Sequence, residues 1–490
     1  MWGHGSGALN GTPLVDQMLC PVAQLRVRCS GFQDEGPRSA ANPMLHNWAA
    51  VLFRQMGWIT LICASALPLL ELSVSEPLAD GSAQSGPHRW SAGRLRVIEA
   101  GQLTWEGAAA VRLRGQSTAA LPQKSFALEL RDSLGEDLKV SLLGMPEEAD
   151  WILYAPYRDP TLVRNLLVYD IAREMWGAAG AVRTRFCTVH LSGPPAESES
   201  PRFWGLYVLM EKIERGPERV CITKLGKRDL TAPSISGGYL FKRDTAPVGT
   251  VFTTPYGQHL EIIEPDEPQP RQTEWLQAWI NQAETALPRT KMPWSPQQTA
   301  RHWDWETFRD HIILSEVFKN PDAYQRSVYF TKDREGPVRA LPLWDFDMAM
   351  GSTRSTQAGS PHSWIFKNLE PVQYPWFVQF IQNADCKSLL QLRYRELRTG
   401  NLATHSLHGR IDRILAPLIE SAPINVNVPS EPEATTPPLA RHFQRWPASL
   451  QTQADTPTSE EAIRLHSEKI AKLKRWLTSR LEWMDQHFDW

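Results

Sequence analysis

The chain has 490 residues, of which 42% are hydrophobic and 22% charged, a globular composition with apolar material for one large domain or two to three ordinary ones. Its formal net charge of −2 excludes a global basic field for nucleic acid, so an anionic ligand needs a local cluster of cations. The six cysteines include no CxxC pair, which argues against a structural zinc site. Spacing alone leaves a Cys187–Cys221 disulfide open.

The N-terminal part contains an uncharged stretch. Residues 1–43 show no period and are interpreted as an extension outside any domain. The sixteen uncharged residues 55–70 are too few for a membrane span of ~20 but fit a signal-peptide core, with a small-x-small cleavage pattern at 64–66. We expect residues 44–73 to be a signal peptide or a membrane anchor, tethered through 55–70, and the protein to be extracytoplasmic. A buried helix of a soluble fold is the alternative.

A linker rich in Ser, Gly and Pro at 74–90 precedes a series of segments with the alternating apolar residues that are typical of strands. These segments are residues 111–115, 124–130, 137–143, 184–191, 203–213 and 237–244. A helix is predicted among them at 159–175, because it begins with Asp-Pro and repeats an apolar residue every four positions.

A second long helix is predicted at 303–320, which ends before a proline. The segments 327–333 and 338–347 then resemble a hairpin. Residues 421–441 are expected to be disordered, and residues 459–486 carry the apolar stripe of a final helix. The predicted fold class is α+β, with one domain at 91–420 and its helical C-terminal part at 442–490.

Two aspartates lie in the most apolar short stretch of the chain, LPLWDFDMAMG. If the strand continues through Asp345 and Asp347, their side chains point the same way with Cα atoms about 6.6 Å apart. Buried carboxylates that close repel each other, and a divalent metal resolves the conflict. Mg²⁺ takes one or two carboxylates together with waters and phosphate oxygens. A salt-bridged acidic pair without metal is the alternative.

Two further polar residues, Asn320 and Asp322, lie where the helix gives way to a strand. A carboxylate at such a turn can accept a hydroxyl proton or bind metal, although Asn-Pro-Asp is also ordinary turn chemistry.

A basic cluster lies upstream, in RLRGQSTAALPQKSF at 112–126. Arg114 and Lys124 flank a turn of small residues that includes Ser117, and such a turn with a lysine on the return strand is one way to hold phosphates. A polar hairpin is the alternative. Glu211, at the end of a strand, is the candidate partner that would position Lys124.

The ordered series RLRGQS, PQKSFALEL, DWILYAPYRDPTLVRN, FWGLYVLMEKIE, GGYLFKRD, NPD and PLWDFD resembles the spore-coat protein H (CotH) kinase family. The similarity runs from about residue 95 to 350, with a weaker echo at the C-terminus. The resemblance implies an atypical two-lobed protein-kinase-like fold, with an antiparallel sheet in the N-lobe and a mostly helical C-terminal part. It also implies ATP and Mg²⁺ (or Mn²⁺) as cofactors, and Ser or Thr of a secreted or coat protein as the acceptor.

Carried over by position, the resemblance implies that Lys124 binds the ATP phosphates, with Arg114 and Ser117 nearby. Glu211 and Lys242 lie on matching strands and are grouped with this nucleotide site.

The remaining candidates form the catalytic and metal site. The resemblance implies that Asp322 is the catalytic-loop acid and that Asp345 and Asp347 are metal-binding acids. Asn320 is grouped with them as a metal ligand, and Asp345 counts as both catalytic and metal-binding.

Two residues depart from the family pattern, because Gln116 and Ser327 stand where asparagine is usual. Two alternatives therefore remain open: a non-catalytic binding module of the cell envelope, and a kinase-fold enzyme that transfers another group, such as AMP or an amino acid. A glycosidase is disfavoured because it would leave the basic cluster without a purpose. Nucleic acid is not an expected partner, because no basic stripe is interleaved with aromatics.

Overall fold

The computed structural model describes most of the chain after residue 66. The described residues are 67–76, 78, 90–115, 118–194, 200–245, 247–287, 294–352, 355–421, 436–451 and 456–488. Internal contacts divide the chain into residues 1–50 and residues 51–490, and every described residue belongs to the second unit, which is described by itself. The predicted extension at 1–43 and the apolar residues 55–66 lie outside the described residues.

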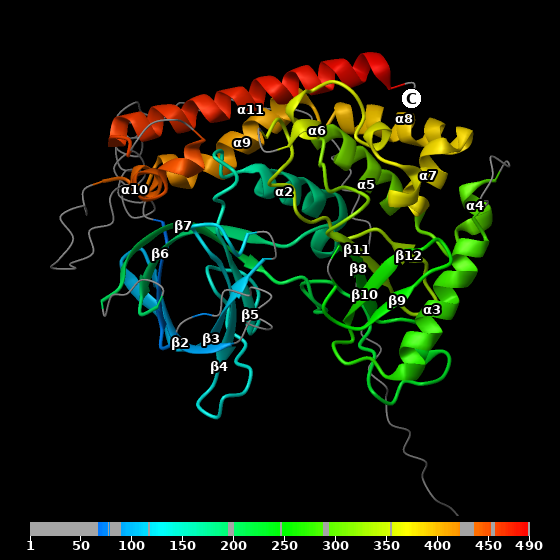
Figure 1. Cartoon of the computed structure of the whole chain (residues 1–490), viewed down its shortest axis with the longest axis horizontal. Helices are drawn as coiled ribbons and strands as arrows, with labels where there is room; N and C mark the ends of the chain where they lie inside the picture. Colours follow the sequence, from blue (N-terminus) through cyan, green and yellow to red (C-terminus); the bar gives the residue numbers. More distant parts are fainter. Residues whose placement is uncertain are drawn as a thin grey trace, which may run out of the picture. The chain divides into compact units, whose positions relative to one another are not determined.

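Seven strands close into a barrel in the order β1-β2-β3-β4-β5-β7-β6 (Figure 1). Their bounds are β1 Leu69–Val74, β2 Ser91–Glu99, β3 Gln102–Arg114, β4 Ser125–Arg131, β5 Asp150–Tyr154, β6 Thr184–Ser192 and β7 Arg202–Glu211. Alternate residues of each strand point inward, and Leu72, Val111, Leu128 and Leu209 belong to the buried core of this part. The closing pair, β1 with β6, is parallel, whereas the other neighbours are antiparallel.

A second sheet has the strand order β12-β11-β8-β10-β9. Its strands are β8 Tyr239–Arg243, β9 Val251–Thr253, β10 His259–Glu264, β11 Val328–Lys332 and β12 Val338–Arg339. Helix α3 (Pro270–Thr285) packs against this sheet, where the rings of Tyr239 and Trp275 stack with centroids 6.0 Å apart.

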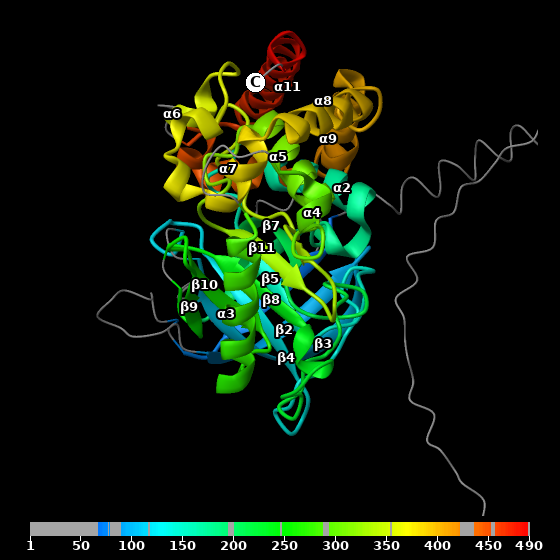
Figure 2. The ribbon, with the colours of Figure 1, turned by 90° about the vertical axis from the view of Figure 1, so that its right-hand side faces the viewer.

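Most of the helices lie on one side of the two sheets (Figures 1 and 2). Among the described residues, the α-helices besides α3 are α2 Arg164–Trp176, α4 Pro296–Thr299, α5 Trp305–Phe318, α6 Thr356–Gly359, α7 Pro375–Gln382, α8 Ala384–Arg398, α9 Thr404–Ile419, α10 Pro438–Arg445 and α11 Ser459–His487. None of the helices in the described part of the chain has both the length and the apolar character needed to cross a bilayer.

The presence of helices and sheets together confirms the predicted α+β class. The predicted strands at 111–115, 124–130, 184–191, 203–213 and 237–244 fall on β3, β4, β6, β7 and β8 and are confirmed. The antiparallel sheet expected for the first part is instead a closed barrel, because β1 bridges β2 and β6 and removes the free edges.

The domain begins earlier than the predicted residue 91. Residues 69–73 of the predicted leader and residue 74 of the predicted linker form β1, which pairs with two barrel strands. The strand expected at 137–143 is absent, since only isolated bridges link Asp137 and Val140 to their partners.

The helix predicted at 159–175 begins later, at Arg164. The carboxylate of Asp159 accepts the backbone N–H groups of Thr161 and Arg164, both at 2.9 Å, and so forms a turn that precedes the helix. The helix predicted at 303–320 is α5, capped where Asp304 accepts the backbone N–H of Thr307 at 3.3 Å.

The final helix predicted at 459–486 is confirmed as α11. The disorder expected for 421–441 is wrong at its C-terminal end, because α10 begins at Pro438 and docks on β7, where His442 Nδ1 accepts the backbone N–H of Leu206 at 3.2 Å. Residues 422–435 lie outside the described residues. Cys187 is a buried free thiol, so the disulfide with Cys221 is not formed.

A buried cation joins α11 to α5. The guanidinium of Arg480 donates to the backbone carbonyls of Glu316, Pro361 and Ser363 at 2.6–3.0 Å. It also lies 3.7 Å from the Glu316 carboxylate, and both side chains are 0% exposed. That carboxylate in turn accepts the hydroxyl of Tyr324 at 2.9 Å.

The variant Arg480→Met is expected to lower the free energy of unfolding by about 3–5 kcal/mol, because the Glu316 carboxylate would stay buried without its cation. Arg475→Met, at an exposed position of the same helix, should change it by less than about 0.5 kcal/mol. Urea denaturation of both variants measures the difference. Equal stability of the two variants would contradict a stabilising role for the buried pair.

Candidate active site

The segment that carries the two aspartates is not a strand. β12 ends at Arg339, and Asp345 adopts a φ of 66°, a left-handed conformation that costs a non-glycine residue of order 1–3 kcal/mol. The prediction that Asp345 and Asp347 share one face of a strand is therefore wrong. Asp347 is 6% exposed, so the expected burial of this carboxylate is confirmed.

Side chains from elsewhere in the fold hold the backbone at Asp345. Tyr169 of α2 accepts its N–H at 3.2 Å, and Asn320 donates to its carbonyl at 3.0 Å. Asn165 of α2 accepts the N–H of Phe346 at 2.6 Å. These three hydrogen bonds fix the backbone around Asp345. They therefore stabilise its left-handed conformation.

Arg164 hydrogen-bonds the backbone of the residues that follow Asp345 and Asp347. Its Nε donates to the carbonyl of Ala349 at 2.9 Å, and its Nη2 donates to the carbonyl of Met350 at 3.3 Å. The guanidinium is itself paired with the buried carboxylate of Asp159. The first turn of α2 therefore positions the segment on both sides of Asp347.

The three carboxylates of the site differ in their surroundings. Asp345 accepts the hydroxyl of Ser327 at 3.0 Å, and Asp347 accepts the hydroxyl of Tyr154 at 3.3 Å. Burial raises the pKa of Asp345, against the Ser327 hydrogen bond. Burial and then repulsion by Asp345 raise the pKa of Asp347 to about 7 and that of Asp322 to about 6.

Asn320 links the two acidic loops. Its Oδ1 accepts the backbone N–H of Asp322 at 3.0 Å, while its Nδ2 holds the carbonyl of Asp345. The side-chain amide of Asn320 thus hydrogen-bonds the backbone at Asp322 and at Asp345. Its predicted role as a metal ligand stays a prediction. Asp322 is 23% exposed at its side chain and lies 3.2 Å from the guanidinium of Arg326.

Of the predicted phosphate-binding cations, Arg114 contacts the acidic segment through Trp344. Its guanidinium lies 5.2 Å from the ring centroid of Trp344. Burial lowers the pKa of Arg114, and the charges of Tyr329, Tyr169 and Asp345 oppose that effect. Arg114 therefore lies beside the acidic segment, and its predicted role in phosphate binding stays a prediction.

The predicted pair between Lys124 and Glu211 is wrong. Glu211 accepts the backbone N–H and the guanidinium of Arg183 at 2.7 and 2.8 Å. Lys124 donates to the carbonyl of Ala119, and its own carbonyl accepts the hydroxyl of Tyr207. Because Glu211 lies four residues beyond Tyr207 in β7, about 13 Å along the strand, the two side chains occupy different levels of the barrel.

The last two nucleotide-site candidates are Ser117 and Lys242. Ser117 lies outside the described residues. Lys242 pairs with Asp244 at 3.4 Å and with Glu261 at 3.3 Å, and lies opposite Tyr329 in the β8–β11 register.

The family model described as CotH kinase protein matches residues 111–484. The chain belongs to the CotH kinase family. A search among curated proteins found no similar sequence. The resemblance expected from the motifs is confirmed, and the family match continues past residue 350 through most of α11.

Several site residues of this CotH kinase family member carried no expected role. Tyr154, Asn165 and Tyr169 contact the acidic segment directly. The charge of Arg158 opposes the rise in the pKa of Asp345, Asp347 and Asp322. All four residues lie in or beside the motif DWILYAPYRDPTLVRN. The polar residues within this largely apolar stretch are the sequence feature that could have indicated their role.

The acidic residues of the described part of the chain do not form a preformed metal-coordination site. Within the described ranges, no group of three or more His, Cys, Asp or Glu side chains is arranged to hold an ion. Mg²⁺ requires only one or two carboxylates when phosphate oxygens and waters complete its octahedron. Asp345 and Asp347 fit that requirement in number, and the repulsion by Asp345 that raises the pKa of Asp347 would be relieved by a nearby cation.

The variant Asp347→Asn is expected to stabilise the protein at high pH in metal-free buffer. A folded pKa of about 7, against an unfolded value of about 3.9, means that the folded state keeps a proton that the unfolded state loses, so wild-type stability falls as pH rises through this window. The gain of the variant should be absent at about pH 4 and reach a few kcal/mol by about pH 8.

Urea midpoints in EDTA across this range measure the effect. Glu482→Gln, at an exposed position of α11, is the control and should give a difference that is nearly independent of pH. A stability difference for Asp347→Asn that does not change with pH would contradict the raised pKa.

Proposed function

We propose that this protein is an atypical kinase that transfers a phosphoryl group from ATP to a Ser or Thr hydroxyl of a protein substrate. The observation that carries the proposal is the acidic segment, in which Asp347 is buried and Asp345 half-buried. Repulsion by Asp345 helps to raise the pKa of Asp347, and a bound cation would relieve it. Membership of the CotH kinase family supports the reaction class. If the fold has the two lobes of a protein kinase, the barrel would form one lobe and the helices on one side of the two sheets would form the other.

The metal of this reaction is proposed to be Mg²⁺ or Mn²⁺, held by Asp345 and Asp347. When bound, the ion supplies neutralisation of the phosphate charge. Ser327 and Tyr154 each donate a hydroxyl hydrogen bond to one of these carboxylates, which orients the carboxylate and leaves its remaining lone pairs for a ligand.

Asp322 is proposed as the base. Its pKa, raised to about 6 by burial and by Asp345, is closer to neutrality than that of an ordinary aspartate, which suits proton transfer. Its side chain is partly exposed and therefore accessible to a substrate hydroxyl. The proton of that hydroxyl would pass to the Asp322 carboxylate, while Arg326 and Asn320 hold the loop in position.

Arg114 and Lys124 are proposed to bind the nucleotide phosphates, together with the predicted Ser117. Stacking on Trp344 fixes the plane of the Arg114 guanidinium, so little rotamer freedom is lost on binding. Lys124 would exchange the carbonyl of Ala119 for a phosphate oxygen. The carboxylate partners of Lys242 support a positioning role for it within the second sheet.

Replacing the proposed base tests this function directly. Asp322→Asn should lower kcat for transfer of labelled phosphate to a protein acceptor by ~10²–10⁴-fold, because a positioned base contributes that much. Its affinity for nucleotide should change little. The exposed Glu482→Gln variant is the matched control, and equal labelling by Asp322→Asn and the control would rule out this role for Asp322.

Nucleotide binding without transfer is a second candidate, because Ser327 already occupies one oxygen of Asp345. Saturation with ATP and Mg²⁺ at ~100 times the dissociation constant should stabilise the fold by ~2.7 kcal/mol in either case. Stabilisation without labelled product would favour the binding module. The intact mass of a modified acceptor separates phosphate from AMP or an amino acid.

We further propose that the protein acts outside the cytoplasm, after cleavage of a leader at 64–66 or with the apolar stretch kept as an anchor. Such an anchor would have to end before the predicted residue 70, because Leu69 and Leu70 belong to β1 and are buried in the fold. The fold constrains such cleavage, because Leu69 begins a barrel strand. N-terminal sequencing of the mature protein should therefore find a start before Leu69. A start after Val74 would contradict the proposal, since it would remove β1 and open the barrel.

A further inference from the structure

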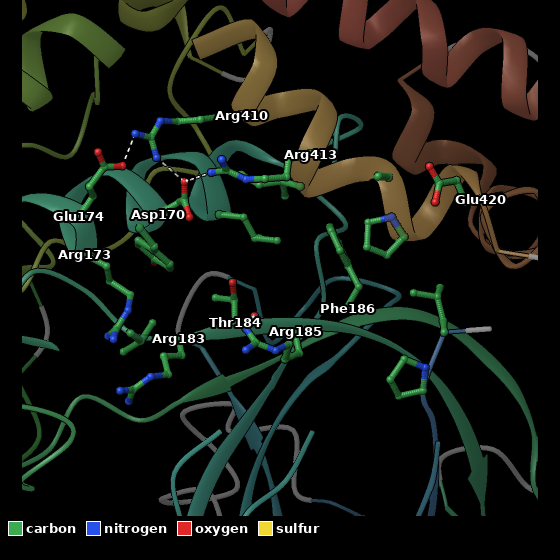
Figure 3. Close-up of a pocket in the computed structure, with 18 residues that line it drawn as sticks. Asp170, Arg173, Glu174, Arg183, Thr184, Arg185, Phe186, Arg410, Arg413 and Glu420 are labelled. Carbon is green, nitrogen blue, oxygen red and sulfur yellow. Dashed lines mark hydrogen bonds and ion pairs between the residues drawn. The ribbon is translucent and has the colours of Figure 1, made fainter. Parts of the chain in front are cut away.

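A cavity of about 860 Å³, the arginine-rich cavity, lies between α2, the start of β6 and the C-terminal half of α9 (Figure 3). Arg410 and Arg413 in its wall both donate to the carboxylate of Asp170, at 2.6 and 2.7 Å. Arg183, also in the wall, pairs with Glu211 at 2.8 Å. Carboxylates of the protein itself therefore neutralise these three arginines.

Two arginines of β3 differ from them. Within the part of the chain that the structure describes, neither Arg112 nor Arg114 is in an ion pair with a carboxylate, and the buried Nε of Arg112 has no hydrogen-bond acceptor. The Arg112 guanidinium lies 4.7 Å from the ring centroid of Trp90, directly before β2, and that of Arg114 lies 5.2 Å from Trp344, directly before Asp345. Because a guanidinium remains charged in proteins, both positive charges remain for an anion.

Both side chains extend from the outer face of the barrel. Val111 and Leu113 belong to the barrel core, so Arg112 and Arg114 alternate outward, with Cα atoms about 6.6 Å apart. Burial, and to a lesser extent repulsion by Arg112, lowers the pKa of Arg114. The two guanidinium groups are therefore neighbours on one face of β3.

The same outer face contacts the acidic segment. In the register of β3, β4 and β5, Arg112 lies opposite Ala127, which lies opposite Ile152. Tyr154 is two residues beyond Ile152, shares that face of the barrel and donates to Asp347 at 3.3 Å. This part of the barrel surface therefore borders the proposed metal site.

The carboxylates near the two arginines have other partners. Glu129, on the outer face of β4, pairs with Arg131 at 2.7 Å. Asp345, whose charge acts on Arg114, accepts the hydroxyl of Ser327 and belongs to the proposed metal site. Binding of an anion to the two arginines therefore displaces no carboxylate from an ion pair with them.

We propose that Arg112 binds the α-phosphate of the nucleotide, so that the phosphate chain runs along β3 from the acidic segment past Arg114 to Arg112. The inference rests on the proposed kinase function, which assigns Arg114 to the phosphates and gives Arg112 no role. The spacing of the two arginines is comparable with the length of a triphosphate chain. Trp90 holds the plane of the Arg112 guanidinium, so little rotamer freedom is lost on binding, and charge-assisted bonds from arginine to phosphate are strong.

Isothermal titration calorimetry on the full chain with Mg²⁺ tests the proposal. The probes are AMP-PNP, a non-hydrolysable analogue of ATP, and ADP, which lacks the γ-phosphate. Arg112→Gln should weaken both nucleotides by the same factor of about 10 or more, because both carry the α-phosphate. Arg94→Gln is the matched control, since Arg94 is exposed on β2 of the same barrel and pairs with Glu106 at 2.7 Å. It should leave both affinities unchanged.

A second variant separates nucleotide binding from folding. Arg112→Lys keeps the charge but loses the planar fork of donors, so it should weaken both nucleotides by a smaller factor than Arg112→Gln. If Arg112→Gln does not fold, Arg112→Lys decides by the same comparison with Arg94→Gln.

The outcomes distinguish this inference from the function on which it rests. AMP-PNP affinity equal to that of Arg94→Gln, or weakening of AMP-PNP without weakening of ADP, would overturn the role of Arg112 and leave the proposed function intact. Failure of the wild-type protein to bind AMP-PNP would reject the proposed function, and this inference with it.

Discussion

The buried contact between the first turn of α2 and the acidic segment is the constraint on which the site depends. Arg164, paired with Asp159, donates to two carbonyls just beyond Asp347, and Asn165 accepts the N–H of Phe346. An arginine with this many fixed donors imposes a geometry that a flexible lysine would not. The backbone of the segment is therefore held on both sides of Asp347, whose side chain stays buried.

This restraint has an electrostatic consequence. Carboxylates that could rotate outward would relieve their repulsion in solvent, but Asp347 is held at 6% exposure and its pKa rises to about 7. The protein thus stores unfavourable free energy that a cation would release, which is how function and local strain are commonly linked. Asn320 extends the arrangement to Asp322, so the proposed base and the proposed metal-binding acid share one amide.

Helix α2 has a second role, because its residues also line the arginine-rich cavity. Tyr169 takes part in both regions: it accepts the N–H of Asp345 and stacks on Trp344 with ring centroids 5.6 Å apart.

Local pattern was sufficient for the α+β class, for most strands and for the long helices, because periodicity reports which face of a segment is buried. It also singled out Asp345 and Asp347, since charges in an apolar stretch need a partner. Only tertiary structure decided that β1 closes the barrel, that Glu211 pairs with Arg183, and that Asp345 is left-handed. Each of these depends on hydrogen bonds or ion pairs between residues distant in the chain, which no local period encodes.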